Sequence, residues 1–104
     1  MSTPASLTPA ARRALAEAAR WIADDNPAAA RRFREAVAEA GRLIGARPFA
    51  GRVQPDLVGD QYRFWSLPGF PFVLVYRPAT LPPQIVRVIH TSRDLPAALT
   101  DLRD

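Results

Sequence analysis

The residues best suited to chemistry lie near the end of the chain, in the stretch VRVIHTSRDL (residues 86–95). His90, the only histidine in the sequence, stands between Arg87 and Arg93. An imidazole can act as a general base and two guanidinium groups can hold a phosphate, so this set would suit cleavage of RNA. The alternative is that His90 ends a strand and forms a local hydrogen bond. We favour this alternative, because no acid that would complement the base is evident nearby; Tyr76, the nearest candidate, falls on another predicted strand.

Signatures of other reactions are absent from the sequence. The 104 residues contain no phosphate-binding glycine loop, no nucleophile elbow and no histidine pair at metal spacing. The chain also has no cysteine, which excludes disulfides, thiolate nucleophiles and cysteine metal sites. We therefore expect no metal and no other cofactor.

Length and composition predict one globular domain over residues 1–104. No apolar run approaches the roughly 20 residues needed to span a bilayer, and the N-terminus lacks the order of a secretory signal. We expect a cytoplasmic protein without membrane contact. The formal net charge is +4, and all 14 basic residues are arginine. Guanidinium groups bind carboxylates and phosphates alike, so an acidic protein and a nucleic acid both stay open as partners.

Two segments show the apolar spacing of amphipathic helices. Thr8 is a suitable N-cap for a helix that begins at Pro9 and ends near Asp24 and Asp25, and Asn26 is the N-cap of a second helix that stops at Gly45. Their apolar stripes are Ala11, Leu15, Ala18, Ile22 and Phe33, Val37, Ala40, Ile44. The short connection predicts an antiparallel helical hairpin. Trp21 lies beside the first stripe, where we interpret it as core or helix packing.

Three strand candidates follow a loop that is rich in proline and glycine. They are QYRFWSL (61–67), FVLVYR (72–77) and QIVRVIH (84–90), and short turns between them favour antiparallel pairing. The segment ASL (5–7) could add an edge strand, and residues 94–102 could form one or two helical turns. The predicted fold class is α+β, with the N-terminal antiparallel helical hairpin packed on one face of a small three- to four-stranded, mainly antiparallel sheet.

The second face of this sheet has no predicted cover. The aromatic residues Phe64, Trp65, Phe70 and Phe72 lie close together in sequence, and the strands are apolar on both sides. The basic residues in or just beyond the strands are Arg63, Arg77, Arg87 and Arg93, and the register decides which of them share a face. We hypothesise a protein partner that covers this face with a helix or an added strand and matches its carboxylates to the arginines.

The order of these segments resembles the ParE branch of the ParE/RelE superfamily of bacterial type II toxin–antitoxin systems. The similarity runs from about residue 7 to residue 95. It is carried by LTPAA (7–11), NPAAA (26–30), Pro48 with Gly51-Arg52, Arg63, VYR (75–77), RVIH (87–90) and Arg93-Asp94.

The resemblance implies a toxin of the stress-response type that a cognate ParD-like antitoxin neutralises within a hetero-oligomer. ParE-like members are associated with inhibition of DNA gyrase by binding, without chemistry of their own. RelE-like members cleave messenger RNA on the ribosome, and a degenerate member would retain antitoxin binding alone. The sequence departs from the RNase pattern in two places. The entry to the middle strand is Gly69-Phe70-Pro71-Phe72, and no tyrosine follows Tyr76.

These implications assign roles to the candidate residues. For the binding activity we predict target contact by Arg87, His90 and Arg93. For the RNase alternative the same three residues would form the catalytic site. The residues predicted to contact the antitoxin are Trp65, Phe72, Arg63 and Arg77, and for the apolar ones a place in the core is the alternative.

Overall fold

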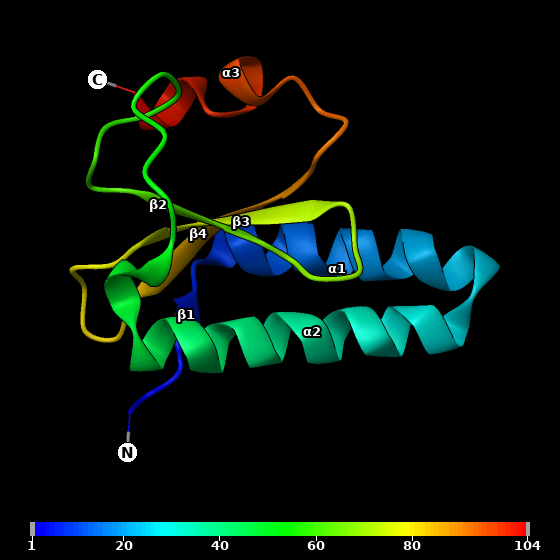
Figure 1. Ribbon diagram of the computed structural model, residues 1–104. Coiled ribbons are helices and arrows are strands. Elements are labelled where there is room, and N and C mark those ends of the chain that lie inside the picture. The colour runs from blue at the N-terminus through cyan, green and yellow to red at the C-terminus, as the bar shows by residue number, and fades with distance from the viewer. Residues whose placement is uncertain (1, 104) are drawn as a thin grey trace.

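A pair of long helices lies against one face of a four-stranded sheet in the computed structural model, which describes residues 2–103 (Figure 1). The helices are α1 (Pro9–Asp25) and α2 (Pro27–Ala46). The strands are β1 (Ser6–Leu7), β2 (Arg63–Ser66), β3 (Phe72–Arg77) and β4 (Gln84–His90). Three short helical segments complete the order: η1 (Pro48–Ala50), α3 (Leu95–Ala98) and η2 (Thr100–Leu102). The predicted α+β class and the helical hairpin are confirmed.

Both long helices begin where the sequence predicts. The Thr8 hydroxyl accepts a hydrogen bond from the Ala11 N–H at 3.1 Å, and the Asn26 side-chain oxygen accepts one from the Ala29 N–H at 3.1 Å. These bonds satisfy N–H groups that have no partner within the first turn of a helix. Asn26 also ends α1, because its own N–H donates to the Ile22 carbonyl. One residue therefore separates the helices, which forces them to run side by side in opposite directions (Figure 1).

Gly45 does not stop the second helix, and that prediction is wrong. The helix continues through Gly45 and ends at Ala46. The glycine serves the N-terminal segment, which crosses α2 at this point: a Cβ on Gly45 would lie 2.9 Å from the Pro4 Cα. A side chain at position 45 would therefore push the N-terminal segment away from the helix.

The strands are arranged in the order β1-β4-β3-β2. The strands β2, β3 and β4 pair antiparallel, whereas β1 pairs parallel with β4 through Ser6 opposite Gln84 and Leu7 opposite Ile85. The register of β3 and β4 shifts once, because Val75 stands opposite Arg87 and Tyr76 opposite Ile85. Val86 is the extra residue of this bulge.

Each face of the sheet carries its own core. The face toward the helices buries twelve residues in one cluster, Phe33, Ile44, Leu74 and Tyr76 among them. On the other face lies a second cluster formed by Val58, Tyr62, Phe64, Val73, Val75, Val86, Ile89 and Leu99. Figure 1 shows α3 and the neighbouring turns on the side of the sheet away from α1 and α2.

The hypothesis that a partner must cover the second face is therefore wrong. The protein covers this face with its own C-terminal segment and with the loop that precedes β2, and Leu99 is fully buried there. The prediction of an exposed aromatic cluster is also wrong in part, because the side chains of Phe64 and Phe72 are buried, with only 2% and 6% exposed. Within residues 2–103, no helix is long and apolar enough to cross a membrane.

Candidate functional site

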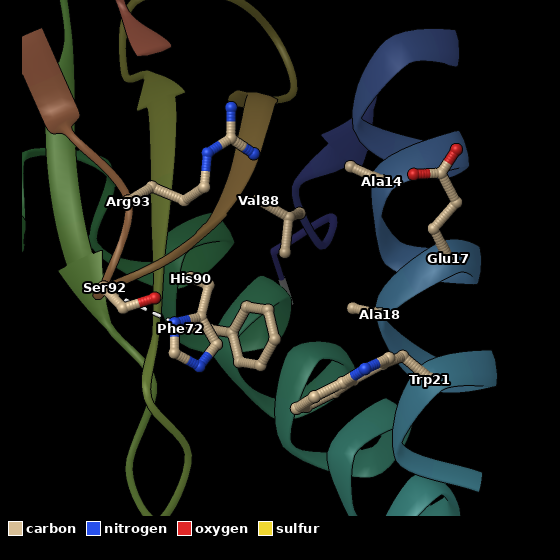
Figure 2. Close-up of a pocket in the computed structure, with 9 residues that line it drawn as sticks. All are labelled: Ala14, Glu17, Ala18, Trp21, Phe72, Val88, His90, Ser92 and Arg93. Carbon is tan, nitrogen blue, oxygen red and sulfur yellow. Dashed lines mark hydrogen bonds between the residues drawn. The ribbon is translucent and has the colours of Figure 1, made fainter. Parts of the chain in front are cut away.

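A cleft lies between α1 and the C-terminal end of β4 (Figure 2). We call it the α1–β4 cleft, and its volume is about 500 Å³. Its lining comes from α1 (Ala14, Glu17, Ala18, Trp21), from β3 (Phe72), from β4 (Val88, His90) and from the turn after β4 (Ser92, Arg93). The cleft therefore has an apolar floor, and charged and polar side chains lie at its rim.

The local geometry of each element explains this lining. Residues four apart lie on one face of a helix, so Ala14 and Ala18 form a wall of small side chains with Trp21 at its end. Residues two apart lie on one face of a strand, so Val88 and His90 both face this wall. Figure 2 shows the open space between the two walls.

Aromatic contacts and one hydrogen bond fix the ring of His90. Its Nδ1 accepts a hydrogen bond from the backbone N–H of Ser92 at 3.0 Å (Figure 2). The neutral imidazole therefore carries its proton on Nε2 and presents a donor there. The Phe72 ring lies edge-on to the imidazole at 5.1 Å between centroids, and the Trp21 ring lies 6.5 Å away in a similar orientation. The predicted local hydrogen bond of His90 is thus present.

Trp21 is the main feature of the cleft that the sequence did not reveal. Its side chain is 68% exposed, so the interpretation of Trp21 as core or helix packing is wrong. The buried line of α1 follows Ala11 and Ala19, and Trp21 lies off it toward the end of β4. The position of Trp21 beside the apolar stripe, and not within it, was the signal that it could be exposed. The sequence alone did not show that β4 lies near this side of α1.

The three residues predicted to form the target site do not all meet. His90 and Arg93 both line the α1–β4 cleft. Arg87 stands opposite Val75, whose side chain belongs to the second core, and its guanidinium pairs with Asp101 of η2. The guanidinium of Arg87 also donates to the Val86 carbonyl at 2.7 Å. Arg87 therefore lies on the far face of the sheet from His90, and the two predicted phosphate-binding arginines do not converge on the imidazole.

The four residues predicted to contact a partner do not form one surface in the structure either. Phe72 packs against Phe33 at 4.9 Å between ring centroids, and Trp65 is half-buried against the same core. These positions agree with the core alternative for both side chains, and partner contact by either one stays a prediction.

The two arginines of this set are engaged within the protein. Arg63 lies over the Phe49 ring and donates to the Phe49 and Gly51 carbonyls at 2.9 and 3.1 Å. Arg77 lies over the Tyr62 ring and donates to its hydroxyl at 3.1 Å. They are separated because Arg63 stands opposite Tyr76, on the helix side, whereas Arg77 contacts the second core. Their contact with a partner stays a prediction.

The buried hydroxyl of Tyr76 lies outside the cleft and has a structural role. It donates to the Pro48 carbonyl at 2.7 Å and accepts from the Gly51 N–H at 2.9 Å. Burial raises the pKa of Tyr76, while the Gly51 hydrogen bond and the charge of Arg63 oppose this rise. The tyrosine therefore attaches the turn after α2 to the sheet. Among residues 2–103, no cluster of three or more histidine and carboxylate side chains could hold a metal ion.

Comparison with known proteins places the chain in a described family. Residues 5–95 match the family described as "ParE toxin of type II toxin-antitoxin system, parDE". No curated protein matches the sequence significantly. Among solved structures, the fold is similar to a chain of the "Chromosomal ParDE TA system from P. aeruginosa", with a TM-score of 0.66 and 21% sequence identity. That match covers 83% of this chain and 95% of the other.

Proposed function

We propose that this protein, which belongs to the ParE toxin family of type II toxin–antitoxin systems, inhibits DNA gyrase by binding it. A ParD-like antitoxin neutralises the toxin in the bacterial cytoplasm by forming a complex with it. The family match supports the toxin class, and the resemblance to the ParE branch supports gyrase as the target. The similar fold of a chain from a ParDE system agrees with the toxin class.

The contact with gyrase is assigned to the rim of the α1–β4 cleft. Trp21 is 68% exposed, and His90 and Arg93 lie beside it. Tryptophan and arginine are the residues that most often dominate the energy of protein interfaces. The imidazole Nε2–H and the Arg93 guanidinium supply donors for carboxylate or phosphate groups of a gyrase–DNA complex.

The hydrogen bond from the Ser92 N–H to His90 Nδ1 is the observation that favours a binding function over an RNA-cleaving one. A general base needs a free lone pair, and this bond occupies the only lone pair of the neutral imidazole in that tautomer. The separation of Arg87 from His90 adds to this argument, because one of the two arginines needed for the scissile phosphate lies on the other face.

An assay with purified DNA gyrase tests the proposal. The toxin is incubated with gyrase, ATP and relaxed plasmid, and supercoiling and protein-linked broken DNA are both measured. We expect supercoiling to be lost and broken DNA to accumulate, and we expect the antitoxin to reverse both effects. Unaffected gyrase together with cleaved messenger RNA on translating ribosomes would replace the proposal with the RelE-like activity.

Variants at the rim connect this activity with the cleft. Trp21→Ala and Arg93→Ala should each raise the toxin concentration needed for half-inhibition by roughly tenfold, or about 1.4 kcal/mol, which is more than most interface residues contribute. Leu81→Ala is the matched control, because Leu81 is 96% exposed in the turn at the opposite end of β4. Equal inhibition by all three variants would remove the cleft from the proposal without removing gyrase.

A further inference from the structure

Charge is unevenly distributed along the molecule. The adjacent carboxylates Asp24 and Asp25 lie at the α1–α2 turn, and both are exposed. Figure 1 shows η1 as the short green turn after α2, at the end of the molecule away from the α1–α2 turn. Residues 40–55, which include η1, contain arginine but no aspartate or glutamate, and the same holds for residues 61–93, which include β2, β3 and β4. The η1 end is therefore basic and attracts anions.

The η1 turn is firmly held for so short a segment. Tyr76 donates to the Pro48 carbonyl at 2.7 Å and accepts from the Gly51 N–H at 2.9 Å. Arg63 donates to the Phe49 and Gly51 carbonyls at 2.9 and 3.1 Å, and its guanidinium lies over the Phe49 ring, 5.2 Å from the centroid. Four hydrogen bonds to two side chains of the sheet thus fix this turn. A surface that is fixed in advance loses little further freedom when it binds a partner.

Three side chains at this fixed turn are open to solvent. Arg47 precedes η1 and Arg52 follows it, and both are exposed. Phe49 lies between them and is 59% exposed. We call these three residues the η1 surface. In the part of the chain that the structure describes, neither of the two ion pairs involves Arg47 or Arg52, so both guanidinium groups are available to a ligand.

The chemistry of the η1 surface fits the backbone of duplex DNA. Guanidinium groups bind phosphates in bidentate fashion, and phosphate contacts supply nearly all the affinity of binding that is independent of sequence. Arginines together with an exposed apolar ring are the side chains with which many proteins enter the minor groove. An acidic protein would also satisfy the arginines. The proposed target complex contains DNA, however, so phosphates lie close to a bound toxin, and this favours DNA.

We propose that the η1 surface binds the phosphate backbone of duplex DNA. Arg47 and Arg52 each contact a phosphate, and the Phe49 ring lies against the sugar edges of the minor groove. Arg63 is a positioning residue, because it holds the Phe49 ring and the η1 turn in place. This inference deepens the proposed function and rests on it in one respect, namely that the target is an enzyme bound to DNA.

The η1 surface and the rim of the α1–β4 cleft lie at opposite ends of the molecule. Trp21 lies in the last turns of α1 and His90 ends β4, whereas η1 is bonded to Tyr76 near the end of β3, where β4 begins. The 20 residues of α2 span roughly 30 Å between these ends. A toxin of this shape can contact gyrase at one end and DNA at the other.

Contact with both components accounts for trapping of a gyrase–DNA state. A ligand shifts an equilibrium only by its differential affinity for the two states. A toxin that held gyrase alone would bind the enzyme equally well with and without cleaved DNA. A toxin that holds gyrase and DNA together gains both sets of contacts only in the arrangement that places them at its two ends.

Binding of the toxin to DNA alone tests the η1 surface. Full-length toxin is titrated into a short dye-labelled duplex without gyrase, and fluorescence anisotropy is measured at several salt concentrations. We expect a dissociation constant on the order of 10 to 100 μM at physiological salt, as for binding that is independent of sequence. The Arg47→Gln/Arg52→Gln variant should bind at least about tenfold more weakly. Its plot of log affinity against log salt should be less steep by about 1.8, the value for two lost phosphate contacts.

Arg31→Gln/Arg32→Gln is the matched control. Both arginines are exposed in the first turns of α2, so this variant loses the same charge at the other end of the helix. It should bind the duplex within about twofold of the wild type, because charges more than about 10 Å from the phosphates are screened by salt. Phe49→Ala should weaken binding without changing the salt dependence, since an apolar contact releases no counterions.

Three results would overturn the proposal. The first is a wild-type toxin that does not bind the duplex. The second is equal weakening by the two double variants, which would show that net charge alone attracts the DNA. The third is polyglutamate that competes with the duplex as well as unlabelled DNA does, which would assign the η1 surface to an acidic protein.

The gyrase assay separates this inference from the proposed function. The Arg47→Gln/Arg52→Gln toxin should still bind gyrase through the cleft, but it should accumulate several-fold less broken DNA than the wild type. A toxin that poisons gyrase without binding duplex DNA would refute the η1 surface and leave gyrase as the target. A toxin that binds duplex DNA through these arginines without affecting gyrase would do the reverse.

Discussion

Removing the hydroxyl of Tyr76 should loosen the turn that follows α2. The side chain is fully buried, and its hydroxyl bonds to both the Pro48 carbonyl and the Gly51 N–H. Tyr76→Phe keeps the ring in the core but deletes both hydrogen bonds. Gly51 is itself buried, so its N–H would be left without this partner and without free access to water.

The size of the effect follows from these two bonds. A neutral intramolecular hydrogen bond contributes about 1 kcal/mol, and a buried donor left unsatisfied adds to the loss. We expect Tyr76→Phe to lower the free energy of unfolding by about 2 to 3 kcal/mol, against roughly 5 to 15 kcal/mol for a domain of this size. Urea denaturation should show a lower midpoint with an unchanged slope. Tyr62→Phe is the control, because the Tyr62 hydroxyl accepts one bond from the exposed Arg77, and it should cost less than about 1 kcal/mol.

Ionisation of the Tyr76 hydroxyl should lower the free energy of unfolding at high pH. Burial raises the pKa of Tyr76 in the folded state above its ordinary value of 10.0. The folded protein therefore holds this proton more tightly than the unfolded chain, so the contribution is complete below pH 10.0 and is lost as the pH rises through the folded pKa. Tyr76→Phe should lack this part of the alkaline decline. A variant within about 0.5 kcal/mol of the wild type, with an unchanged alkaline slope, would refute the reasoning.

Three further predictions address the C-terminal cover, the crossing of the N-terminal segment and the two arginines. Leu99→Ala should lower the free energy of unfolding by about 2 to 5 kcal/mol in urea, because a fully buried leucine is replaced by a cavity; a change below about 1 kcal/mol would show that the C-terminal segment does not hold the second core. Gly45→Ala should displace the N-terminal segment and speed exchange of the Ala5 amide, which donates to a carbonyl of α2, and unchanged exchange would contradict the close approach. Arg93→Ala should weaken gyrase inhibition more than Arg87→Ala, since Arg87 lies on the far face; an equal loss would contradict this assignment.

Features that depend on a few neighbouring residues could be predicted from the sequence. The caps at Thr8 and Asn26 are local, because each bonds a backbone group three residues ahead. The short helix α3 begins after Asp94 for the same reason, because the Asp94 side-chain oxygen accepts a hydrogen bond from the Ala97 N–H. The antiparallel pairing of β2, β3 and β4 follows from short connections, which leave the chain few alternatives.

Features that depend on distant contacts could not be predicted. The burial of Leu99 needs the second sheet face and the loop around Val58, which lie far apart in sequence. The face that Arg87 occupies depends on the bulge at Val86, because one extra residue turns the following side chains to the other side. Trp21 joins the site only because α1 packs beside β4. The sequence therefore indicated His90, Arg93 and Phe72, all of which line the cleft, but it placed Arg87 with them and left Trp21 out.

Direct binding of the toxin to a gyrase–DNA complex tests the central claim most plainly. Toxin carrying a dye in the exposed turn at Leu81, away from the cleft, is titrated with the complex while fluorescence anisotropy is measured. The account predicts saturable binding that the antitoxin prevents and that Trp21→Ala weakens roughly tenfold. Absence of binding by the wild-type toxin would contradict gyrase as the target, and binding that Trp21→Ala does not affect would contradict the cleft.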